Sequence, residues 1–75
     1  MKAITVPNYY ADDIAEVEAL RVAERLERAQ CGRMNPGDAA YCLAAAESCL
    51  ARALDAEGHY EAARAVREGR AVVAV

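Results

Sequence analysis

The stretch Met34-Asn35-Pro36-Gly37-Asp38 separates two long alanine-rich segments and is the clearest local signal in the sequence. Asn35 can cap a helix, Pro36 suits the first helical position, and Asp38 then falls in the first turn. We therefore predict a helix over residues 35–57. Its apolar residues recur at helical spacing and form one stripe: Ala39, Leu43, Ala46, Leu50 and Ala53.

Residues 9–31 are predicted to form a first helix, which Asn8 caps and Gly32 ends. Apolar residues in it alternate spacings of four and three, as in a coiled-coil seam: Ala15, Ala19, Val22, Leu26 and Ala29. A second apolar edge consists of Ile14, Val17 and Leu20. Oppositely charged side chains at i+3 and i+4 spacing are expected to form a solvated face: Glu18, Arg21, Glu24 and Arg28.

The helical pattern is interrupted at Gly58-His59. Either a tight turn leads there into a third helix over residues 59–70, or the second helix continues with a kink, and we favour the turn. The ends of the chain are expected to be extended. Residues 1–8 form an arm, and the apolar residues 71–75 form a tail that can pair with or pack on Ile4–Val6.

Residues 1–75 are therefore expected to form a single all-α domain, an antiparallel hairpin of two long helices with a short third helix or a kinked continuation. A chain of this length buries only about 60% of the surface that its unfolded form exposes. Such chains usually recruit disulfides, a metal or a second subunit, and only the last is indicated here. We expect a homodimeric helical bundle. Its core and dimer contacts are predicted at Ala15, Ala19, Val22, Leu26, Leu43, Ala46, Leu50 and Leu54.

The cysteines and the single histidine do not suggest a metal site. The three cysteines form no CxxC pair, and His59 lies in a different segment, so neither a metal nor a cofactor is expected. An odd number of cysteines and a start without the apolar region of a secretory signal favour a reducing cytoplasm. Cys42 and Cys49 are interpreted as small apolar fillers.

The net charge of −3, the pI near 5.0 and the single lysine, Lys2, argue against nucleic-acid binding. A helix-turn-helix interpretation fails as well, because residues 39–43 offer no arginine, lysine, asparagine or glutamine to read base edges. No apolar run approaches the length that spans a bilayer, so no membrane association is expected.

Catalytic motifs are not found in the sequence. It has no Ser-His-Asp set, glycine-rich phosphate loop or HExxH motif. Asp12 and Asp13 are adjacent, so their side chains diverge around a helix and cannot face one substrate together. We expect no enzymatic activity.

One polar strip on the predicted second helix is a candidate contact surface. Tyr41, Ser48, Arg52 and Asp55 lie on the side away from the apolar stripe. Tyrosine and arginine are enriched in binding hot spots, so these four residues are predicted to contact a partner protein. The alternative is that Tyr41 only covers the loop between the two helices.

Tyr9 and Tyr10 at the start of the first helix allow two interpretations. They either anchor a partner or close off the end of the core. We favour the second, because terminal aromatic residues of small helical proteins usually pack on the core.

The segment with Leu50-Ala51, Leu54, Gly58-His59-Tyr60 and Ala63 resembles one tetratricopeptide unit. Arg67 and Arg70 stand where that family has an aromatic residue and an alanine, and the chain holds no second copy. Ordinary packing of a helical hairpin explains the same pattern.

The extended start, the charged first helix and the hairpin MNPGDAAYCLAAAESCLARALDAEGHYEAARAVREG together resemble a small bacteriophage accessory protein. The family that this layout resembles is the phage-encoded quorum-sensing anti-activators. These short, helical, dimeric proteins bind a host LuxR-type regulator and can also bind the ATPase that extends type IV pili. The resemblance implies an adaptor or inhibitor in the host cytoplasm, with Tyr41 and Arg52 as partner contacts. The alternative function is a structural component that forms a homo-oligomeric bundle, or a single tetratricopeptide-like interaction unit.

Overall fold

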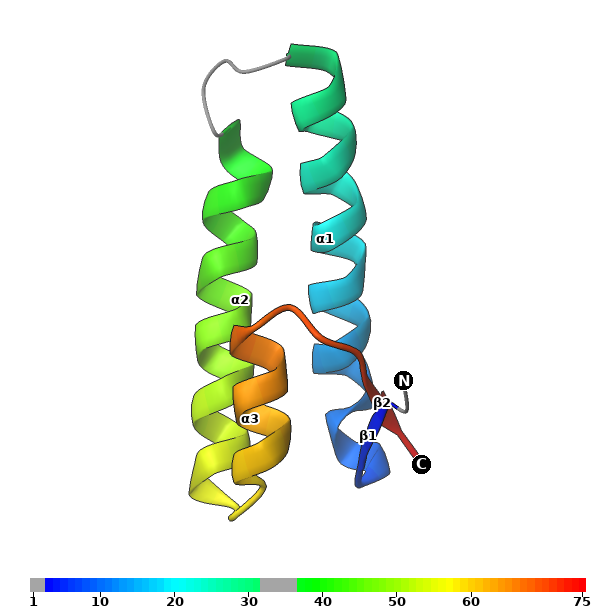
Figure 1. Ribbon diagram of the computed structural model, residues 1–75, viewed down its shortest axis with the longest axis vertical. Helices are drawn as coiled ribbons and strands as arrows, with labels where there is room; N and C mark the ends of the chain where they lie inside the picture. Colours follow the sequence, from blue (N-terminus) through cyan, green and yellow to red (C-terminus); the bar gives the residue numbers. More distant parts are fainter. Residues whose placement is uncertain (1–2, 32–36) are drawn as a thin grey trace.

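The computed structural model describes residues 3–31 and 37–75 of the chain. Helices account for most of the described residues, and two of them are long (Figure 1). In chain order the elements are β1 (Ile4–Val6), the 3₁₀ helix η1 (Asn8–Tyr10), α1 (Ala11–Cys31), α2 (Gly37–Ala56), α3 (Tyr60–Arg67) and β2 (Val72–Ala74).

α1 and α2 form the predicted antiparallel hairpin, and α3 folds back along the C-terminal half of α2 (Figure 1). The structure therefore contains the predicted turn at Gly58 and a separate third helix, and not a kinked continuation of α2. Gly58 adopts φ +87°, a left-handed conformation that side chains with a Cβ disfavour. The amide of His59 then donates to the carbonyl of Leu54 at 2.8 Å, which closes the end of α2.

The all-α class needs one correction, because β1 and β2 form a two-stranded parallel sheet. Thr5 pairs with Val73 in its register, and the amide of Val75 donates to the carbonyl of Val6 at 3.0 Å. Of the two alternatives for the apolar tail, pairing with the arm or packing on it, the structure contains the pairing. Both segments are short and rich in β-branched residues, which favour the extended backbone. The two ends of the chain therefore lie side by side (Figure 1).

The core lies at the end of the molecule where α3 and the sheet meet the hairpin. α3 contributes mainly alanines, whose small side chains let its backbone approach α2 closely. The buried cluster consists of Val6, Tyr10, Val17, Leu50, Ala51, Leu54, Ala62, Ala63, Ala65, Val66 and Val72. Ile4, Ile14, Leu43 and Ala46 pack against it and are partly buried.

The start of the first helix differs from the prediction. Asn8 is not an N-cap, because it lies inside η1, and α1 begins only at Ala11. Pro7 precedes η1 in an extended conformation and turns the chain from β1 into the helix. Of the two tyrosines, Tyr10 is buried and closes the core as predicted, whereas Tyr9 is 64% exposed.

The predicted solvated face of the first helix is wrong for Arg21 and Glu24, whose side chains are only 17% and 14% exposed. The guanidinium of Arg21 donates to Glu18 at 2.8 Å, to Glu47 at 3.2 Å and to the main-chain carbonyl of Val66 at 3.2 Å. Arg21 therefore joins α1 to α2 and to α3. Sequence spacing predicted the pair with Glu18, but it could not reveal Glu47 and Val66, because these two belong to other helices.

Candidate functional site

The outward face of α2 carries the strip that the sequence predicts as a partner surface. Tyr41 is 79% exposed, and Ser48 and Arg52 are exposed on the same side of the helix. Leu50 and Leu54 point the opposite way, into the core. The structure thus brings Tyr41, Ser48 and Arg52 together on one solvent-facing surface. We call these three residues the α2 strip.

Asp55 differs from the other three predicted contacts. Its carboxylate Oδ2 accepts a hydrogen bond from Arg67 of α3 at 2.8 Å, and the residue is partly buried. This ion pair ties α2 to α3, so Asp55 stands at the edge of the α2 strip with an intramolecular partner. The alternative role of Tyr41, covering the loop between the long helices, concerns residues 32–36, which lie outside the described residues.

The eight residues predicted for the core or the dimer fall into two groups. Leu50 and Leu54 are buried, and Leu43 and Ala46 are partly buried against the core. The four predicted residues of α1 are exposed: Ala15, Ala19, Val22 and Leu26. The helix uses its other apolar edge, with Ile14, Val17 and Leu20, to face the interior.

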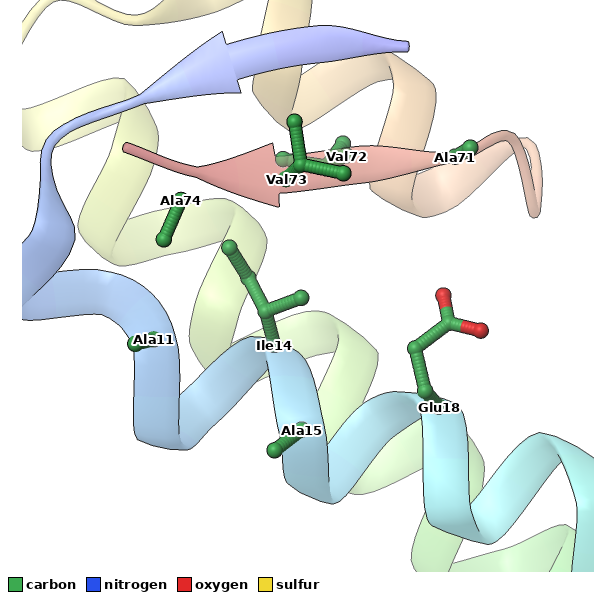
Figure 2. A pocket seen from close by; sticks show the side chains of 8 residues that line it. All are labelled: Ala11, Ile14, Ala15, Glu18, Ala71, Val72, Val73 and Ala74. Atoms are coloured by element: carbon green, nitrogen blue, oxygen red, sulfur yellow. The ribbon is translucent and has the colours of Figure 1, made fainter.

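A cleft of about 370 Å³ opens between α1 and β2 (Figure 2). Ile14 and Glu18 point from α1 toward the strand, and β2 lies between this cleft and β1 (Figure 2). The cleft walls are mostly apolar, with the carboxylate of Glu18 at one end. Sequence reasoning missed this cleft, because it depends on the tail pairing with the arm and then lying across α1.

A second groove of about 550 Å³ runs between α1 and α2 and is lined in part by Ala19, Leu20 and Ala45. Cys42 and Cys49 also line it, and both are exposed free thiols. Their interpretation as small apolar fillers is therefore wrong, because a side chain that fills the core would be buried. Their seven-residue spacing does place them on one face of the helix, but that face is turned to the groove and to solvent.

An aromatic cluster closes the end of the hairpin at the α2–α3 turn. The ring of Tyr10 lies 4.4 Å from that of Tyr9 and meets His59 edge to face at 5.8 Å. The hydroxyl of Tyr9 donates to Glu57 at 3.2 Å. The hydroxyl of Tyr10, partial desolvation and the carboxylate of Glu57 raise the pKa of Tyr9 to about 12.

The described residues contain no group of three or more histidine, cysteine, aspartate or glutamate side chains that could hold a metal ion. Within residues 3–31 and 37–75, none of the helices combines the length and the apolar character that crossing a bilayer requires.

Some of the positions that resemble a tetratricopeptide unit are buried, as expected for that family, and one is not. Leu50, Ala51, Leu54 and Ala63 are buried between α2 and α3. Tyr60, in contrast, is 69% exposed. Packing of an ordinary helical hairpin buries the same four residues, so they do not distinguish the two interpretations.

Comparison of the chain with protein-family models, with curated proteins and with solved structures gives no match. The resemblance to phage anti-activators thus stays a prediction from the sequence. The function has to be argued from the surfaces described above.

Proposed function

We propose that the protein is a small adaptor or inhibitor that binds another protein through the α2 strip. The observation that carries this proposal is Tyr41, which exposes 79% of its surface on the side of α2 away from the core. A tyrosine so exposed adds nothing to the packing of the subunit. It can offer a partner a large, rigid contact area at a low entropy cost.

Arg52 and Ser48 supply directional contacts beside Tyr41. The five N–H donors of an arginine suit carboxylates on a partner, and the described residues include no ion-pair partner for Arg52. The strip therefore fits a protein surface that offers a pocket for an aromatic ring beside acidic groups.

The proposed partner is a host regulatory protein in the cytoplasm. The resemblance to phage anti-activators names two candidates, a LuxR-type regulator and the ATPase of type IV pili. Binding and blocking such a protein needs no chemistry from the adaptor, so we propose no enzymatic activity.

Affinity measurements with a purified LuxR-type regulator and a purified pilus ATPase test this proposal. The double variant Tyr41→Ala with Arg52→Ala is expected to bind at least about 30-fold more weakly, the effect of losing a hot spot. Tyr60→Ala with Arg64→Ala is a matched control, because both residues are exposed on α3. Equal affinity of the two double variants would contradict the proposed surface.

A structural role is the second candidate, and the exposed apolar residues of α1 favour it. Val22 and Leu26 are 46% and 59% exposed, although buried positions are the usual place for such residues. A chain that only builds homo-oligomers would grow beyond a closed pair with concentration. Light scattering over a concentration series separates this candidate from a small adaptor.

A further inference from the structure

The outward side of α1 is a second apolar face that the subunit itself does not use. Ala15, Ala19, Val22 and Leu26 alternate spacings of four and three and are all exposed. We call these four residues the α1 seam. The opposite side of α1 faces the core, and Val17 is buried there. α1 is therefore apolar on two opposite sides, which is the pattern of a helix packed between two neighbours.

We propose that two copies of the chain pair through the α1 seam, with their α1 helices antiparallel. In this arrangement Ala15 lies opposite Leu26 of the second copy, and Ala19 lies opposite Val22 of the second copy. Each layer of the interface then combines one small and one large side chain. The layers are equally thick, and the two helices stay in contact over the whole seam.

A parallel pair would pack less evenly. It would place Ala15 and Ala19 against their own copies at one end and Leu26 against its own copy at the other. The helices would have to diverge toward Leu26 or leave voids between the alanines. Uniform packing therefore selects the antiparallel orientation.

Charges beside the seam select the same orientation. Glu18 and Arg25 lie seven residues apart on one flank of the seam, and both are exposed. Oε1 of Glu18 accepts a hydrogen bond from Arg21 of its own helix at 2.8 Å, and the side chain keeps 53% of its surface exposed for a second contact. In the antiparallel pair each Glu18 faces Arg25 of the second copy, which gives two symmetric ion pairs at the rim. On the other flank Glu16 faces Ala23, so no like charges oppose each other. A parallel pair would bring Glu18 to Ala23 and form neither ion pair.

This pairing does not depend on the proposed function, because the seam and the α2 strip are on different helices. The strip lies on the side of the hairpin away from α1, so it stays free when α1 is covered. A dimer formed in this way presents two copies of the strip, at opposite ends of the particle. It can therefore engage two partner molecules or two sites of a symmetric one.

Sedimentation of the full-length chain over a concentration series tests the pairing. The wild-type chain is expected to reach a closed dimer that grows no further. Leu26→Glu puts a charge into the seam of both subunits and is expected to raise the dissociation constant at least about 100-fold. Ala44→Glu is the matched control, because Ala44 is exposed on α2, away from the seam, and this variant should dimerise like the wild type.

Circular dichroism separates a lost interface from a lost fold. The helix content of Leu26→Glu should equal that of the wild type, because Leu26 is not part of the buried cluster. A well-folded Leu26→Glu chain that still dimerises with wild-type affinity would overturn the proposal. So would a wild-type chain that stays monomeric at millimolar concentration.

A charge exchange tests the orientation. Glu18→Arg and Arg25→Glu each create like-charge contacts and are expected to weaken the dimer about 10-fold or more. Both changes together restore opposite charges and should return the affinity to within about threefold of the wild type. A double variant as weak as the two single changes combined would contradict the ion pairs.

A distance measurement decides between the two orientations directly. A spin label at Ala29→Cys, with the three native cysteines replaced by serine, should lie roughly 25 Å along the axis from its copy in the antiparallel pair. A parallel pair would bring the labels to about 10 Å. The short distance would overturn the antiparallel model, and the long one would support it.

Discussion

The two ends of the hairpin are built differently. At the end with the chain termini, α3 packs on α2 and β2 packs on α1, and these elements enclose Val17, Leu54 and Val66 (Figure 1). At the other end α1 and α2 have only each other among the described elements (Figure 1). Two large apolar side chains there, Leu26 and Tyr41, are exposed, and Leu43 is only partly buried.

The difference shows that a chain of alanine-rich helices buries some of its large apolar side chains and leaves others exposed. One end uses them to fold, since a third helix and a sheet cover them. The other end and the outer sides of both long helices keep apolar groups on the surface, where they contribute little to the stability of the folded chain. These exposed groups form the two surfaces for which we propose contacts, the α2 strip and the α1 seam.

The largest expected effect is at the covered end. Leu54 is fully buried, so Leu54→Ala should lower the free energy of unfolding by about 3 kcal/mol. Leu43 is only partly buried, and Leu43→Ala should cost about 1 kcal/mol. Urea unfolding of both variants measures the two losses in the free energy of unfolding. Equal losses would show that the two ends are equally packed.

Arg21 links the three helices between the two ends, and its removal should have the next largest effect. Arg21→Met keeps the unbranched apolar stem of the side chain but leaves Glu47 and the carbonyl of Val66 without a donor. We expect a loss of about 2 kcal/mol. The control is Arg64→Met, which removes an arginine that is 76% exposed and pairs with the exposed Glu68, and it should cost less than about 0.5 kcal/mol. Similar losses in urea unfolding would refute the linking role.

A smaller effect is expected at the turn that returns α3 to the core. Gly58 has φ +87° with open space around it, so Gly58→Ala adds only backbone strain. We expect a cost of about 1 kcal/mol. Gly58→Asn should cost less, because asparagine tolerates this conformation. Thermal unfolding that ranks the asparagine variant below the alanine variant would argue against the left-handed turn.

The smallest expected effect is a titration at the aromatic cluster. The folded pKa of Tyr9 is raised from 10.0 to about 12, so its contribution to stability is complete below pH 10 and is lost as the pH rises through 12. The difference in tyrosinate absorbance between wild type and Tyr9→Phe measures this pKa. Glu57→Gln should lower it, because one acceptor charge is removed. A Tyr9 that titrates near 10 in the folded chain would contradict the contact.

Much of the fold follows from the sequence, because the signals are local. The spacing of Leu43, Leu50 and Leu54 and the glycine at position 58 indicate the hairpin and its turn. The β-branched residues of the tail and the arm allow pairing or packing, and the sequence does not choose between the two. The parallel direction of the observed pairing depends on the position at which α3 ends. Local patterns do not contain that direction.

The sequence predicts the exposed side of α2 correctly, but it does not predict which side of α1 is exposed. Helical periodicity correctly puts Tyr41 and Arg52 on the side away from the core. It also finds two apolar sides on α1, but it does not say which one faces the interior. The side of α1 that faces the interior is set by the position of α3, where Arg21 binds the carbonyl of Val66. This contact joins residues that are far apart in the chain. The cleft of Figure 2 is missed for the same reason.

The division between a covered and an open end is tested most directly by amide hydrogen exchange of the monomeric chain at low concentration. The slowest amides should belong to residues near Val17, Leu54 and Val66, and those near Leu26 and Tyr41 should exchange much faster. Equal protection along the full length of α1 and α2 would contradict the account, because the open end would then be as stable as the core.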